Sequence, residues 1–136
     1  MNVKPIVQAL VLAAVFLGVA AALRYAASTG VIGEDLARRS VQVLIGLALA
    51  AYGNMMPKKG GKPRGSIRAE TAAQAALRVG GWSMALAGLV YAALWAFAPL
   101  AVADDVSMIV VASATALTLG FAVWAYATCR RERTAA

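Results

Sequence analysis

Long apolar runs are the feature that most constrains the fold of this chain. Four of them, at about residues 6–27, 36–56, 77–98 and 105–128, are separated by short polar segments. Each is close to the roughly 20 residues that a helix needs to cross a hydrocarbon core of about 30 Å. Hydrophobic residues make up 62% of the chain and charged residues 14%, compared with about half and about a quarter in soluble domains. The sequence therefore predicts an all-α integral membrane bundle of four transmembrane helices in a single domain, residues 1–136.

Local signals set the expected limits of these helices. Pro5 suits the first turn of the first helix, which we read as a retained span and not as a cleaved signal peptide. Pro57 ends the second span, and Pro99 ends the third. Acidic pairs, which are favourable at a helix N-terminus, are expected to begin two of the spans; these pairs are Glu34-Asp35 before the second span and Asp104-Asp105 before the fourth.

Two further patterns concern helix faces. Ser66 fits an N-cap for a short helix beginning at Ile67, which we expect to lie along the membrane interface before the third span. Small residues recur every fourth position on two spans, as they do where helices pack closely. These stripes are Ala14, Gly18 and Ala22 on the first span, and Gly46, Ala50 and Asn54 on the second.

Basic residues indicate the orientation of the chain. Of the thirteen Lys and Arg residues, six lie between the end of the second span and the first turn of the third, at positions 58, 59, 62, 64, 68 and 78, and three lie in the C-terminal tail. Cytoplasmic segments carry such an excess, so we expect this loop and both termini to be cytoplasmic, in a bacterial inner membrane. Arg24, Arg38 and Arg39 disagree, but Arg38 and Arg39 each follow an acidic residue by four positions. Aromatic residues are expected to form an inner belt (Tyr52, Trp82, Trp124 and Tyr126) and an outer one (Tyr25, Trp95 and Phe97).

The spans offer little reactive chemistry. They contain no ionisable residue away from their ends and the chain has no histidine, so we expect no enzyme activity, no metal and no cofactor. Cys129 lies beside arginines, but without a base it is expected to be an inert thiol. The remaining polar side chains are expected to hydrogen-bond between helices or to the carbonyl four residues earlier; they are Gln42, Ser83, Ser113, Thr115 and Thr118.

The sequence of the basic loop does not favour phosphate binding or nucleic-acid binding. Its Gly-Gly-Lys-Pro-Arg-Gly segment lacks the Gly-Lys-Ser/Thr ending of a phosphate-binding loop. The net charge of +7 falls beside apolar spans, which favours membrane lipids over nucleic acid as the partner. The residues expected to contact anionic lipid are Lys58, Lys59, Lys62, Arg64, Arg130, Arg131 and Arg133.

The same loop and its flanks resemble one known family. The pattern Gly53-Asn54, Pro57-Lys58, Gly65-Ser66-Ile67-Arg68, then Arg78 followed by Gly80-Gly81, is similar to the core of the SdpI family, in which two helices are joined by a cytoplasmic loop. The resemblance covers about residues 44–94. It implies a small bacterial membrane protein acting in immunity to a membrane-active toxin, or in signalling through a soluble regulator held at the membrane. The recognition residues it implies are Gly53, Asn54, Pro57, Ile67, Arg68 and Arg78.

Two other functions remain open at this point. The small-residue stripes and the absence of intramembrane charge also suit an accessory subunit of a larger membrane complex. The hydroxyls of the fourth span allow a transporter or channel for a neutral or lipidic substrate. The sequence does not fix the oligomeric state.

Overall fold

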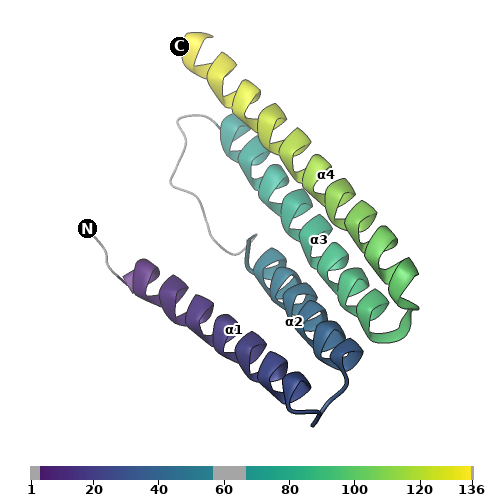
Figure 1. Cartoon of the computed structure of the whole chain (residues 1–136). Helices are drawn as coiled ribbons and strands as arrows, with labels where there is room; N and C mark the ends of the chain where they lie inside the picture. The colour runs from purple at the N-terminus through teal and green to yellow at the C-terminus, as the bar shows by residue number, and fades with distance from the viewer. Residues whose placement is uncertain (1–3, 57–66, 136) are drawn as a thin grey trace. The chain divides into compact units, whose positions relative to one another are not determined.

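The computed structural model describes residues 4–56 and 67–135, and throughout these residues the regular structure is helical. The elements are α1 (Lys4–Ser28), α2 (Glu34–Met55), α3 (Ile67–Phe97) and α4 (Leu100–Ala135), as Figure 1 shows. The expected all-α class is confirmed, and α1 and α2 begin and end within two residues of the first two apolar runs.

By length and composition, three helices within the described residues are apolar enough to cross a membrane: Ile6–Ser28, Ile67–Phe97 and Leu100–Arg131. Helix α2 is not among them, because its first six residues include Glu34, Asp35, Arg38 and Arg39. The charge-free remainder, from Ser40 to Met55, is shorter than the roughly 20 residues that usually cross a bilayer. Crossing by α2 therefore remains a prediction from the sequence.

The chain divides into two compact units, residues 1–42 and 43–136, so that α2 contributes to both. In the first unit α1 ends in a Schellman motif. Gly30 has a φ of 72°, a left-handed conformation that glycine adopts without steric cost. The amide of Val31 donates to the carbonyl of Ala26 at 3.0 Å, and the amide of Gly30 donates to that of Ala27 at 3.1 Å. These bonds end α1 and satisfy its last carbonyls before α2 begins.

In the second unit α3 and α4 form an antiparallel pair that is joined at Pro99 (Figure 1). Small side chains fill much of the buried surface of the described chain, among them Ala69, Ala72, Ala73, Ala87, Ala92, Ala103, Ala114 and Ala125. Close packing of alanine-rich faces is typical of helix contacts in membranes, where dispersion contacts drive association in place of the hydrophobic effect.

The structure corrects two expected helix limits. Helix α4 begins at Leu100, and the amide of Ala103 donates to the carbonyl of Pro99 at 2.9 Å. Asp104 and Asp105 therefore lie beyond the first turn and do not begin the helix, since Pro99 and not the acidic pair sets its start. Helix α3 begins at Ile67 as predicted but runs unbroken to Phe97, so the proposed interfacial segment is the first part of one long helix. Its position at a membrane surface remains a prediction.

Candidate functional site between α2 and α3

Helices α2 and α3 approach each other so closely that their backbones touch. A Cβ built on Gly53 would lie 2.5 Å from the amide nitrogen of Ala85 and 2.7 Å from the carbonyl oxygen of Gly81. At the other end of the contact, a Cβ on Gly46 would lie 2.8 Å from the amide nitrogen of Ala92. Real Cβ atoms essentially never come within 3.0 Å of such atoms. Glycine is therefore required at both positions by packing. The two helices run antiparallel, because the earlier residue of α2 meets the later residue of α3.

The residues in this contact recur at alternating spacings of four and three. On α2 the buried positions of this contact are Gly46, Ala50 and Gly53. The expected stripe ended instead at Asn54, which is exposed. Gly53 replaces Asn54 because a helix has about 3.6 residues per turn. Alternating steps of four and three average 3.5 residues and stay on the face that contacts the partner helix, whereas repeated steps of four move away from that face.

The α3 side of the contact was missed in the sequence. It consists of Gly81, Ala85, Gly88 and Ala92, which repeat the same alternating spacing. A signal was present, because Gly46 and Gly53 are seven residues apart and so are Gly81 and Gly88. Two equal spacings of this kind on neighbouring helices indicate a matched pair of faces.

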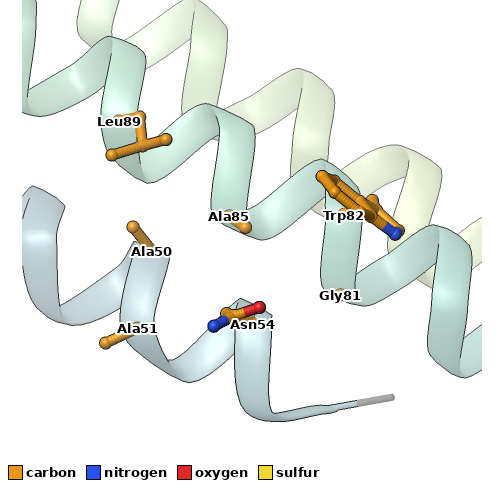
Figure 2. A pocket seen from close by; sticks show the side chains of 8 residues that line it. Ala50, Ala51, Asn54, Gly81, Trp82, Ala85 and Leu89 are labelled. Carbon is orange, nitrogen blue, oxygen red and sulfur yellow. The ribbon is translucent and has the colours of Figure 1, made fainter.

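Beside this contact lies an open apolar groove of about 500 Å³. It is lined by Ala50, Ala51, Gly53 and Asn54 of α2 and by Gly81, Trp82, Ala85 and Leu89 of α3. Figure 2 shows Asn54 on the last turn of α2, with Trp82 at the same end of the groove and Leu89 at the other. The groove exists because glycines and alanines bring the backbones together without filling the space alongside them.

The predicted recognition residues fall into three groups. Gly53 and Asn54 lie at the groove, Gly53 buried in the helix contact and Asn54 on its rim. Ile67, Arg68 and Arg78 lie on α3 and are exposed, Ile67 by 85%. Pro57 lies outside the described residues. The structure thus brings Gly53 to Gly81, and it places the two arginines about 15 Å apart along the axis of one helix.

Of the residues expected to contact anionic lipid, Arg130 and Arg131 lie on α4 and are exposed. The side chain of Arg133 lies outside the described part of the structure. The same is true of four complete residues, Lys58, Lys59, Lys62 and Arg64.

The hydroxyls of α3 and α4 behave as the sequence predicts. The hydroxyls of Ser113, Thr115 and Thr118 donate to carbonyls four residues earlier, each at 2.8 Å. Thr118 also lies 3.2 Å from the hydroxyl of Ser83, which links the two helices. These side chains support the helices and their contact.

Cys129 belongs to the same interface. It is partly buried, and its thiol lies 3.7 Å from the carbonyl oxygen of Ala69 on α3. That contact is a weak hydrogen bond at the end of the helix pair opposite to Pro99. It gives the thiol a packing role between α3 and α4.

One member of the expected outer aromatic belt is misplaced. Trp95 is only 2% exposed and lies with its ring centroid 6.3 Å from that of Tyr91, so it is a core residue. Trp82 and Trp124 of the expected inner belt are 67% and 51% exposed, and their level in the membrane remains a prediction. The position of a tryptophan near the end of a span did not show whether it is exposed or buried, because α3 buries residues on several sides.

Exposed apolar helices, an alanine-rich core and a glycine-packed helix pair are characteristic of a helical membrane protein. Comparisons with protein-family models, with curated proteins and with solved structures find no match for this chain.

Proposed function

We propose that this protein is a small multi-pass protein of the bacterial inner membrane, acting in immunity to, or sensing of, membrane-active agents. In this proposal all four helices cross the membrane, and both termini and the loop between α2 and α3 are cytoplasmic. The loop and the start of α3 are the recognition surface.

One observation carries the proposal. The region in which the sequence resembles the SdpI family, about residues 44–94, coincides with the part of α2 and α3 that is held together by backbone contact. Two positions of the resemblance, Gly53 and Gly81, meet at the loop end of that contact, where a side chain on Gly53 would collide with the Gly81 carbonyl. The pattern thus falls on a closely packed helix pair, α2 and α3.

Arg68 and Arg78 are the side chains best suited to recognition. Both are exposed on α3, beyond the loop and before the apolar part of the helix. A guanidinium binds carboxylate or phosphate groups in a bidentate manner, which a lysine cannot do. A rigid helix that carries two such groups can hold an acidic regulator or sense an anionic agent at the membrane surface.

Survival under challenge with a membrane-active peptide tests this role. The double variant Arg68→Ala, Arg78→Ala should lose protection at unchanged expression. The matched control is Arg130→Ala, Arg131→Ala, which removes the same charge from exposed positions on α4. Protection that is equal in both variants, or that persists when the gene is deleted, would count against the proposal.

An accessory subunit of a larger membrane complex is the second candidate. It is favoured by large apolar side chains that are exposed along α1 and α4, including Leu10, Leu17, Met108 and Ile109. Affinity purification in mild detergent, followed by mass spectrometry, separates the two proposals. A stoichiometric membrane partner would support the subunit role, and recovery of this chain alone would exclude it. A transporter is not favoured, because the hydroxyls that suggested one bond to their own helices.

A further inference from the structure

The face of α3 along the groove changes character in a regular order. Arg78, Trp82, Ala85 and Leu89 follow one another at spacings of four, three and four, so they lie on one side of the helix. Along that line a cation is followed by an indole, then by a small side chain, and finally by an aliphatic one. Trp82, Ala85 and Leu89 line the groove, and Arg78 is exposed one turn before them.

This order matches the layers of one phospholipid leaflet. Arg78 and Leu89 are separated by about 16 Å along the helix axis, close to half of a hydrocarbon core of about 30 Å. Tryptophan prefers the level of the headgroups, and Arg78, leaning toward the N-terminus of α3, reaches the phosphate beyond it. The groove between Ala51, Ala85 and Leu89 has the small lining residues and apolar character that an acyl chain requires.

Helix α2 supplies a second polar group at the correct depth. Asn54 lines the groove at the same end as Trp82, as Figure 2 shows. A carboxamide both donates and accepts hydrogen bonds, so it suits the ester or hydroxyl groups between headgroup and acyl chain. An amide and an indole therefore lie at one end of an apolar groove, and the cation of Arg78 lies one turn before the indole on α3.

We propose that the groove between α2 and α3 is a binding site for one anionic phospholipid, with its phosphate at Arg78, its glycerol region at Asn54 and Trp82, and an acyl chain along Ala51, Ala85 and Leu89. The site does not depend on the immunity or sensing role, since it requires only that α3 crosses the membrane. The positive charge at Arg78 selects an anionic headgroup, and the open side of the groove admits a lipid from the bilayer.

Photolabelling tests this site in the full chain. The protein is reconstituted into phosphatidylcholine vesicles that contain a small fraction of phosphatidylglycerol with a photoreactive group in its acyl chain. After illumination, labelled peptides should map to residues 50–54 and 82–89. The same probe built on phosphatidylcholine should label these peptides about tenfold less, as expected for the loss of charge-assisted hydrogen bonds.

Variants with matched controls separate a site from general lipid contact. Arg78→Gln should lower labelling by phosphatidylglycerol about tenfold, and Arg78→Lys should fall between, because lysine keeps the charge without the planar fork. Arg24→Gln removes one exposed charge from α1 and should change little. Ala51→Leu should block the groove, whereas Ala116→Leu places the same side chain at an exposed position on α4.

Three results would overturn the proposal. The first is equal labelling by the two probes. The second is labelling that persists in both Arg78→Gln and Ala51→Leu while these variants fold normally, as judged by circular dichroism and size-exclusion chromatography. The third is a cross-link between two copies of the chain at these peptides, which would show that a second protein molecule covers the groove.

Discussion

Gly46 and Gly88 face each other across the contact between α2 and α3, and neither position has room for a side chain. A Cβ on Gly46 would lie 2.8 Å from the carbonyl oxygen of Gly88, and a Cβ on Gly88 would lie 2.5 Å from the carbonyl oxygen of Gly46. The obstruction is backbone on both sides, so no change of rotamer relieves it. This reciprocal contact makes α2 and α3 a pair of fixed separation.

The first prediction concerns that contact. Gly88→Ala should destabilise the protein by about 1–3 kcal/mol, the usual cost of overpacking a well-packed core. Gly120→Ala is the control, since nothing lies within 4 Å of a Cβ there, and it should leave stability unchanged or raise it by up to about 1 kcal/mol. Thermal unfolding in mild detergent, followed by circular dichroism, measures both. Equal midpoints for the two variants would contradict the close approach.

The second prediction concerns the hydroxyl pair between α3 and α4. Ser83 and Thr118 lie 3.2 Å apart, and a cycle of Ser83→Ala, Thr118→Val and the double variant should give a coupling energy of about 0.6 kcal/mol, typical of hydrogen bonds between membrane helices. Pairing Ser83→Ala with Thr115→Val is the control, because Thr115 bonds to the carbonyl of Val111 on its own helix. The coupling energy of this control pair should be near zero. A nonzero value would mean that the coupling between Ser83 and Thr118 reflects a general loosening of the helices and not a hydrogen bond between them.

The third prediction separates four spans from three. Single cysteines are placed at Val102 and Thr134 in a Cys129→Ala background and are treated with a membrane-impermeant maleimide in intact spheroplasts. With α2 crossing, Val102→Cys should react from outside and Thr134→Cys only after permeabilisation. If α2 does not cross while the N-terminus stays inside, the two positions exchange sides and the result is reversed. Thr29→Cys should react in both cases and checks the method.

The fourth prediction uses the three tryptophans. Trp82 and Trp124 are more than half exposed, whereas Trp95 is 2% exposed. Phospholipids brominated in their acyl chains should therefore quench most of the fluorescence of Trp82 and Trp124 and little of that of Trp95. Trp95→Phe should raise the quenched fraction and Trp82→Phe should lower it. The opposite order would place Trp95 at the lipid boundary, where the aromatic-belt pattern predicts it.

Much of the fold follows from short-range signals in the sequence. The apolar runs locate the helices, Pro99 separates α3 from α4, and Ile67 begins α3 as expected. These features were predictable because each depends on residues within one or two turns. The hydroxyls of Ser113 and Thr115 were predictable for the same reason, since the carbonyl they reach is always four residues away.

The features that the sequence did not predict depend on which helices pack against each other. A row of small residues indicates that a helix face packs closely, but it does not identify the helix that packs against it. The contact of Gly53 with Gly81 was therefore not predicted. The same lack of a partner made Trp95 look like a belt residue, and it favoured Asn54 over Gly53 in the small-residue stripe. In the candidate site, residue types were therefore predicted better than their neighbours.

The charged start of α2 has a consequence for the biogenesis of the protein. Its first six residues carry four charges, and the apolar remainder is short, so α2 alone is a poor substrate for insertion by the translocon. Helix α3 is long, apolar and matched to α2 by backbone contact. In the four-span arrangement α2 is therefore expected to wait at the translocon until α3 has been synthesised, and the two should enter the lipid together as a hairpin.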